Sequence, residues 1–195
     1  MSRYPVYPPS WPPGDPDTEA AIGRFVIAWG LLELQIDEAI GDIFDVEHTM
    51  QSSIVANLGT KSKIEIFLSA FHIESEFFPA PMLAEVNKLG HDTATAAGVY
   101  RVWVAHGQPF RMEPNSKDED PVSEGAETFE PFWIWAKTHA RKGGVMSSMA
   151  RLTPEIFNNH TEAIKRLVDR WHSIRQRMAR PLTVLRYVKR DAEPE

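Results

Sequence analysis

The feature that most constrains this chain is a series of apolar residues that recur three or four positions apart. This spacing is that of an α-helix with one face buried against other helices. The first series follows Asp17 and Thr18, either of which is a suitable N-cap. Its members are Ile22, Phe25, Trp29, Leu32, Ile36, Ile40 and Ile43. The pattern predicts a long amphipathic helix that packs against others.

A second long series follows Thr153–Pro154, where the threonine is the expected N-cap and the proline the first helical residue. Its members are Phe157, His160, Ile164, Leu167, Trp171, Ile174 and Met178. We expect Pro181 to end this helix because proline removes a backbone donor and clashes with the preceding turn. We interpret His160 as a core histidine whose polar atoms are satisfied.

Three shorter helices are expected between the two long ones. The first covers 46–58, with Asp45 as cap and Gly59 as stop, and the second follows Thr60 as its cap. The last opens with the prolines near position 80 and ends at His106–Gly107. Its apolar stripe is Met82, Val86, Leu89, Thr93, Ala97, Tyr100 and Val104, and its small residues are Gly90, Ala94, Ala96, Ala97 and Gly98. The fold class is therefore mainly all-α, a four- or five-helix bundle.

The segments outside these helices differ in composition. Residues 1–17 are rich in proline and should form an extended arm. Residues 107–145 contain two pieces with strand-like composition, Gln108–Glu113 and Thr128–Lys137, on either side of an acidic tract. We interpret them as a small β-hairpin or small sheet inserted before the last helix, with the acidic tract as its loop. The expected organisation is an arm (1–17), one helical domain (18–180) and a tail (181–195).

Composition excludes several classes of protein. The chain has no cysteine, so it has neither disulfides nor thiolate sites. No apolar run reaches the roughly 18 residues that a membrane-spanning helix needs, and the N-terminus lacks the apolar core of a signal peptide. We expect a cytoplasmic protein without a membrane partner.

The net charge of −6 hides an asymmetry along the chain. Residues 1–100 hold five Lys and Arg against fourteen Asp and Glu, whereas residues 137–190 hold thirteen against three. A basic segment can attract a polyanion such as RNA, because phosphate contacts depend on local charge. Alternatively, its arginines form a solvated helix face that pairs with the acidic half. The residues that we expect to contact RNA are Arg111, Lys137, Arg141, Lys142, Arg166 and Arg170.

Common catalytic motifs are absent from the sequence. There is no Gly-x-x-x-x-Gly-Lys, Gly-x-Gly-x-x-Gly, Gly-x-Ser-x-Gly or His-Glu-x-x-His. The seven histidines include no pair three or four residues apart, so no metal site and no cofactor are expected.

Arg101 and His106 form a minimal set for phosphoryl chemistry without a metal. A guanidinium can bind a phosphate in bidentate fashion and stabilise charge that develops on it. An imidazole can take a proton from an attacking hydroxyl or give one to the leaving oxygen. Five positions along an α-helix correspond to a rotation of about 140°, so the two side chains converge only if the helix changes at its end or the arginine reaches around. A two-fold dimer would bring two such pairs together.

These residues stand in the sequence Tyr-Arg-Val-Trp-Val-Ala-His-Gly at the end of a bundle helix, which resembles the HEPN superfamily (higher eukaryotes and prokaryotes nucleotide-binding) and its Arg-x4–6-His signature. Trp29-Gly-Leu-Leu-Glu33 is similar to the first bundle helix of prokaryotic members. The resemblance covers about residues 18–107 and the last helix. It implies a homodimeric, metal-independent endoribonuclease of the toxin, phage-defence or RNA-processing type. Arg101 would hold the phosphate and His106 would be the acid and base, with the ribose 2′-hydroxyl as nucleophile.

Two further residues are assigned supporting roles. Glu33 lies within roughly 60° of Trp29 and Ile36 on a helical wheel, where it either reaches water at the edge of the stripe or orients a buried arginine. Tyr100 precedes the motif arginine. Val102 departs from the polar residue that usually follows the arginine in active members. This leaves two alternatives: a non-catalytic HEPN-like module that binds RNA, a nucleotide or a protein such as an antitoxin, and a structural or regulatory helical dimer.

Overall fold

The structure, a computed structural model, describes residues 16–101, 108–112, 132–141, 144–151 and 153–192. These residues are mostly helical, as the apolar spacing predicts. In the described part, the α-helices are α1 (Pro16–Phe44), α2 (His48–Val55), α3 (Thr60–Ile73), α4 (Ala80–Ala96) and α6 (Pro154–Ala192). A 3₁₀ turn, η1 (Ser75–Phe77), precedes α4, and a π-helical turn, η2 (Ala97–Arg101), follows it.

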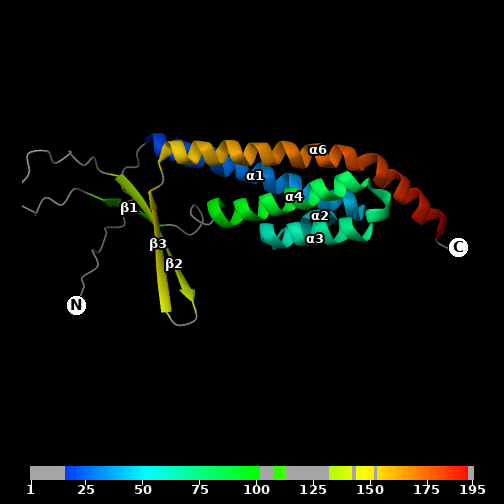
Figure 1. The fold of residues 1–195 in the computed structure, drawn as a ribbon, viewed down its shortest axis with the longest axis horizontal. Coiled ribbons are helices and arrows are strands. Elements are labelled where there is room, and N and C mark those ends of the chain that lie inside the picture. The colour runs from blue at the N-terminus through cyan, green and yellow to red at the C-terminus, as the bar shows by residue number, and fades with distance from the viewer. Residues whose placement is uncertain (1–15, 102–107, 113–131, 142–143, 152, 193–195) are drawn as a thin grey trace, which may run out of the picture.

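The two long helices, α1 and α6, begin at the same end of the molecule and lie side by side, with α3 and α4 packed beneath them (Figure 1). Aromatic rings connect the layers. The ring of Phe25 on α1 meets Phe157 on α6 edge to face, with centroids 6.3 Å apart. On the other side of the bundle, Phe67 on α3 meets Trp171 on α6 edge to face at 5.0 Å.

The apolar stripes predicted from sequence form the core. Fully buried side chains come from α1, α3, α4 and α6, and each contributes about 1.5–3 kcal/mol on transfer from water. They include Phe25, Leu32, Ile36, Ile40, Phe67, Phe71, Leu89, Phe157, Ile164, Trp171, Ile174 and Met178. Gly90 on α4 allows α3 to approach closely, since a Cβ added to it would lie 2.9 Å from Leu68 on α3.

The helix boundaries predicted from the sequence agree with the structure less well than the predicted apolar stripes do. Thr153 is the cap of α6, because its Oγ1 accepts a hydrogen bond from Ile156 N at 3.3 Å. In contrast, α1 begins at Pro16, inside the segment expected to be an arm, which places Asp17 and Thr18 in its first turn. Residues 1–15 lie outside the described part.

The connections around α2 also differ from the prediction. Asp45 does not cap α2: it follows the last residue of α1 with a φ of 53°, in the left-handed region. Glu47 occupies the N-cap position of α2 instead. Gly59 is the N-cap residue of α3 rather than the stop of α2, which ends at Val55. Thr60, the predicted cap, is instead the first residue of α3. These ends depend on how the neighbouring helices pack as well as on local residues.

The prediction that Pro181 ends the last helix is wrong. Helix α6 continues through this proline to Ala192, so most of the expected tail is helical. The apolar spacing explains why, since Leu182 follows Met178 by four positions and both are buried. Thr183 Oγ1 also donates to Ala179 O at 2.8 Å across the proline. The last turns of α6 diverge from the line of its earlier part (Figure 1), as expected where proline removes a hydrogen bond.

Three strands, β1 (Gln108–Met112), β2 (Phe132–Arg141) and β3 (Gly144–Arg151), form an antiparallel sheet in the order β1-β2-β3. Phe110 pairs with Ile134, and Thr138 pairs with Ser147. The two-stranded insertion is not supported in the form predicted, because its second strand pairs on its far side with β3. Sequence gave no signal for β3, which has few β-branched or aromatic residues. The acidic tract lies outside the described residues.

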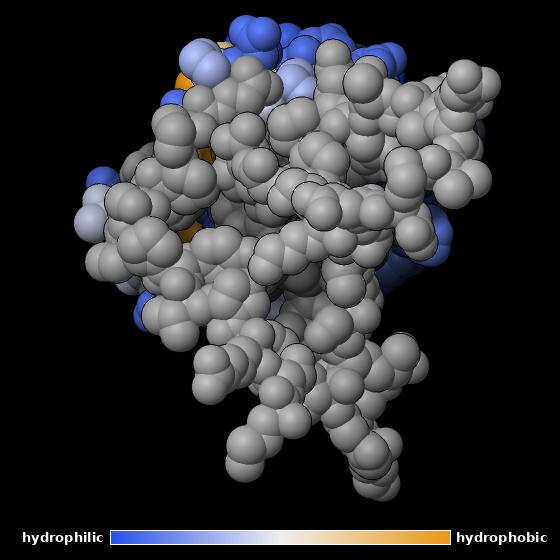
Figure 2. Space-filling model, turned by 90° about the vertical axis from the view of Figure 1, so that its left-hand side faces the viewer, coloured by the Kyte–Doolittle hydropathy of each residue, from blue (hydrophilic) through white to orange (hydrophobic). Residues whose placement is uncertain are grey.

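The sheet lies beyond the end of the bundle at which α1 and α6 begin (Figure 1). Viewed from that end, the described surface along the upper edge is mostly hydrophilic (Figure 2). Among the described residues, no helix is both long enough and apolar enough to cross a membrane.

Candidate functional site

The backbone changes geometry just before the Arg-x4-His motif. Helix α4 ends at Ala96, and Ala97–Arg101 form the π-helical turn η2, in which hydrogen bonds join residues five apart. The α-helical period predicted to continue to His106 is therefore wrong over Ala97–Arg101, and the rest of that interval lies outside the described residues. Gly98 lies in this turn, and glycine weakens an α-helix by about 1 kcal/mol relative to alanine.

The motif itself can be located only in part. The backbone of Tyr100 and Arg101 belongs to η2, whereas their side chains lie outside what the structure describes. Val102 and His106 lie wholly outside it. The convergence of Arg101 and His106 is therefore still a prediction.

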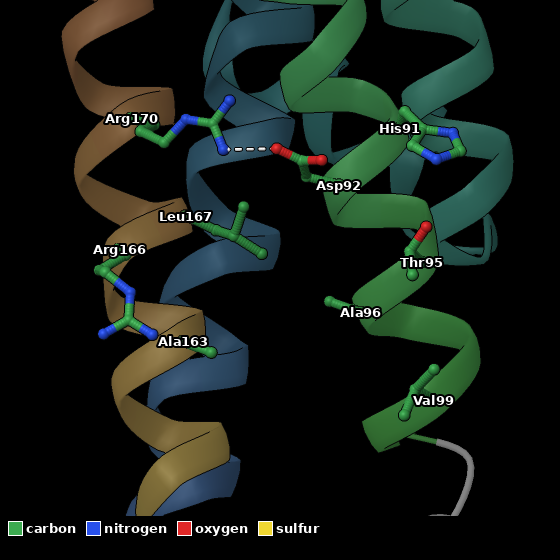
Figure 3. A pocket seen from close by; sticks show the side chains of 9 residues that line it. All are labelled: His91, Asp92, Thr95, Ala96, Val99, Ala163, Arg166, Leu167 and Arg170. Carbon is green, nitrogen blue, oxygen red and sulfur yellow. Dashed lines mark hydrogen bonds and ion pairs between the residues drawn. The ribbon is translucent and has the colours of Figure 1, made fainter.

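Beside this turn, an open groove of about 400 Å³ runs between α4 and α6 (Figure 3). Val99, two residues before Arg101, lines its end near η2. Two of the arginines expected to contact RNA, Arg166 and Arg170, lie together along its α6 side. The remaining lining residues are His91, Asp92, Thr95, Ala96, Ala163 and Leu167.

The two groove arginines differ in their partners. Arg170 Nη1 donates to Asp92 Oδ2 at 2.7 Å, and Lys88 Nζ lies 3.1 Å from the same oxygen. The hydrogen bond from Arg170, helped by Lys88, lowers the pKa of the Asp92 carboxyl, which is therefore an anion at neutral pH. Arg166 is exposed, and no residue in the described part of the chain pairs with its guanidinium. Arg166 is thus the arginine of the groove that can take an external anion.

A buried chain of hydrogen bonds joins α4 to α6 at residues adjacent in sequence to the groove residues Asp92 and Arg170. Trp171 Nε1 donates to Thr93 Oγ1 at 3.0 Å, and this hydroxyl donates in turn to Leu89 O at 2.7 Å. Thr93 and Trp171 are both fully buried. Thr93 follows Asp92 in sequence, and Trp171 follows Arg170. Helices α4 and α6 are therefore joined by two adjacent contacts, the buried Trp171–Thr93 hydrogen bond and the Arg170–Asp92 ion pair at the surface.

The other arginines of α6 help to distinguish the two explanations of its basic charge, contact with RNA and pairing with the acidic half of the chain. Arg175 Nε donates to Asp42 Oδ2 at 2.8 Å, and its Nη1 pairs with Glu38. Arg177 Nη2 lies 2.7 Å from Glu85 Oε1. With Arg170, these contacts support the alternative in which the basic helix pairs with the acidic half of the chain. Sequence did not indicate these partners, which lie far away along the chain.

Glu33 is half-buried on α1, and its Oε1 accepts a hydrogen bond from Thr60 Oγ1 at 2.7 Å. Neither of the two roles predicted for Glu33 included this contact, which joins the start of α3 to the middle of α1. Because the side chain of Arg101 is not described, the role of Glu33 as its partner stays a prediction.

The remaining predicted residues are spread over the sheet and α6. Arg111 is on β1, Lys137 and Arg141 are on β2 with side chains outside the described part, and Lys142 lies outside it entirely. His160 is half-buried on α6, and burial lowers the pKa of its imidazole. Asp92 and Thr95 were missed, although Asp92 lies three positions from Leu89 and Thr95 two positions from Thr93, both residues of the α4 stripe. In the described part of the chain, no group of three or more His, Asp or Glu is placed to hold a metal ion.

No family model, curated protein or solved structure matches this chain.

Proposed function

We propose that this protein is a HEPN-like, metal-independent endoribonuclease that acts through Arg101 and His106 at a homodimer cleft. The observation that carries the proposal is the π-helical turn that leads to Arg101. This turn ends at Arg101, and single π-helical turns occur frequently at functional sites.

The groove supplies the second support. It extends to Val99, close to Arg101, and its exposed Arg166 can bind the phosphates of an RNA strand on the approach to the motif. The Asp92 carboxylate neutralises Arg170, so the groove is not uniformly basic. This arrangement favours a strand whose phosphates follow the Arg166 side.

The reaction needs no protein nucleophile. The ribose 2′-hydroxyl attacks the adjacent phosphorus, and His106 takes its proton while the bond to the 5′-oxygen breaks. His106 then gives this proton to the leaving 5′-oxygen, which leaves a 2′,3′-cyclic phosphate and a 5′-hydroxyl. Arg101 binds the non-bridging oxygens and stabilises their growing charge.

The test is cleavage of a mixed RNA pool in EDTA. The wild-type chain should cut, His106→Ala should lose activity by at least about a hundredfold, and His172→Ala should not change it. His172 is a matched control because it is an exposed histidine on α6 that contacts Gln176. Activity that His106→Ala retains would contradict the proposal, and so would activity that EDTA abolishes.

Val102 favours a second candidate, a non-catalytic HEPN-like module that binds RNA, a nucleotide or a protein partner such as an antitoxin. Such a module would bind an RNA strand without cutting it. Arg166→Gln should then weaken binding and lower the salt dependence by about one phosphate contact, while His106→Ala leaves affinity unchanged. A chain that neither cuts nor binds would fit the third alternative, a structural or regulatory helical dimer.

A further inference from the structure

One face of α1 is apolar and exposed. Its large side chains are Val26, Ile27, Leu31 and Leu34, whose exposed fractions are 51%, 68%, 50% and 43%. At about 100° per residue, these positions fall within an arc of roughly 140°. No charged residue between positions 20 and 34 falls in this arc. An exposed apolar patch of this kind marks an interaction surface.

The arc continues back towards the start of α1 through small residues. Ala20, Gly23 and Gly30 are exposed within it, and a Cβ added to either glycine would meet nothing within 4 Å. Packing inside the bundle therefore does not require glycine at these positions, and glycine weakens a helix relative to alanine. The small residues leave hollows between the large side chains, which suit the ring of an aromatic residue.

The sequence of residues 1–15, which lie outside the described part, is suited to such a surface. Tyr4, Tyr7 and Trp11 each precede a proline, which favours extended or polyproline II backbone at all three. A polyproline II backbone has no internal hydrogen bonds and stays solvated, so only its side chains need to pack. The prolines also reduce the conformational entropy that the segment loses when it is ordered.

The length of this segment matches the length of the face. From Pro16, the first residue of α1, to Leu34 the helix rises about 27 Å. From Pro13 back to Tyr4, polyproline II spans about 28 Å. The glycine and aspartate between these two stretches are residues that favour turns, so the chain can reverse there.

After such a reversal, the rings of the segment come level with the small residues of the face. Distances are measured from the two ends that the turn joins. Trp11 lies about 6 Å along the segment, and Ala20 lies about 6 Å along α1. Tyr7 lies about 19 Å along the segment, and Gly30 about 21 Å along α1. Both rings therefore meet a hollow.

We propose that residues 1–15 fold back along this face of α1 and pack on it through Tyr4, Tyr7 and Trp11. The occupant is this segment because it is joined to the first residue of α1 and because its length and the spacing of its rings match the face. The covalent link also gives it an effective concentration on the order of millimolar.

The proposal goes beyond RNA cleavage and involves no contact between copies of the chain. None of the residues that line the groove between α4 and α6 comes from α1, so the two surfaces are separate. The contact of the segment with α1 is measured without RNA, and it can hold or fail whether or not the chain cuts RNA.

Because the chain has no cysteine, the contact can be tested in the full chain by disulfide formation. The test pair is Val6→Cys with Gly30→Cys, two positions that come level in the proposed arrangement and leave all three rings in place. The control pair is Val6→Cys with Glu162→Cys. Glu162 is exposed on α6, and hydrogen bonds between α1 and α6 join positions 134 or 133 apart, so it lies close to the level of Gly30.

The measured quantity is the effective concentration of each cysteine pair in a glutathione redox buffer. The value for the test pair should exceed that of the control pair at least about tenfold. Adding Ile27→Asp to the test pair should lower it to the control value, because a carboxylate beneath the rings would lose its water. Adding Ile73→Asp should leave it unchanged, since Ile73 is 78% exposed on α3 and lies off the face.

Three results would overturn the proposal. An effective concentration for the control pair that equals or exceeds that of the test pair would show a segment that does not prefer this face. Disulfide-linked dimers formed by Gly30→Cys alone, in preference to the internal disulfide of the test pair, would show a second copy on the face. A loss with Ile73→Asp as large as that with Ile27→Asp would show an effect of charge that does not depend on the face.

Discussion

Thr93 shows how much one buried hydroxyl contributes to the packing of α4 on α6. Thr93→Val keeps the shape of the side chain but leaves the indole N–H of Trp171 without its acceptor. An unsatisfied buried donor costs about 1–3 kcal/mol, so the free energy of unfolding should fall by that amount. Urea denaturation of both proteins measures the difference. Thr93→Ser keeps the acceptor and should lose less, and a valine variant as stable as wild type would contradict the hydrogen bond.

Sequence predicts burial of single residues better than it predicts their polar partners. Trp171 and Thr93 each fall on an apolar stripe, so both are expected inside. Their hydrogen bond joins positions 78 apart, and neither stripe indicates which residue lies opposite. Glu33 shows the same limit: its place beside the stripe was visible, but its contact with Thr60 depends on how α3 crosses α1.

At the scale of elements, the continuation of α6 past Pro181 can be tested with one side chain. Leu182 is 3% exposed, so Leu182→Ala should lower the free energy of unfolding by about 2–5 kcal/mol. Val184, two residues further on, is 53% exposed, and Val184→Ala should change stability by less than about 0.5 kcal/mol. Thermal and urea denaturation of both variants compare them. Equal, small effects would indicate a tail that does not pack.

The long helices could be predicted because their stripes repeat over many turns, whereas their ends could not. A proline usually ends a helix, but the buried Leu182 offsets the lost hydrogen bond at Pro181. The change to π-helical geometry at Ala97 also leaves no periodic signal, because it occupies a single turn. For the candidate site, the sequence suggested Arg101 near a helix end, which is still a prediction, but it did not predict the π-helical turn to which the backbone of Arg101 belongs.

For the whole molecule, the acidic α1 and α4 pair with the basic α6, and this predicts how salt acts at different pH. At neutral pH, added salt should lower the melting temperature slightly, because it screens pairs such as Arg175–Asp42 and Arg177–Glu85. In acid the carboxylates are neutral and the arginines of α6 repel one another, so salt should then raise it. Melting curves at pH about 7 and about 3, with and without salt, provide the comparison. A salt effect on the melting temperature that has the same direction at both pH values would contradict the pairing of the acidic helices with α6.

The carboxyl of Asp92 makes stability depend on pH at the acid end. Arg170 lowers the pKa of Asp92 below 3.8, so the carboxylate contributes stability above this value and loses it as the pH falls through the folded-state pKa. Asp92→Asn should therefore reduce the difference in stability between neutral and acid pH. His160 acts higher in the range: burial lowers its pKa below 6.5, and stability falls as the pH drops below 6.5 towards that folded-state value.

The π-helical turn also has a consequence for the gene. A π turn holds one residue more than the α-helical turn it replaces, so loss of a single codon within Ala97–Arg101 could be absorbed as ordinary helix. The bundle would keep its core, and Arg101 would keep nearly its present orientation relative to Thr93 and the groove, because the α-helical turn that remains holds one residue fewer. Genes that differ by one codon at this point should therefore encode proteins of equal stability that still present Arg101 on the same side.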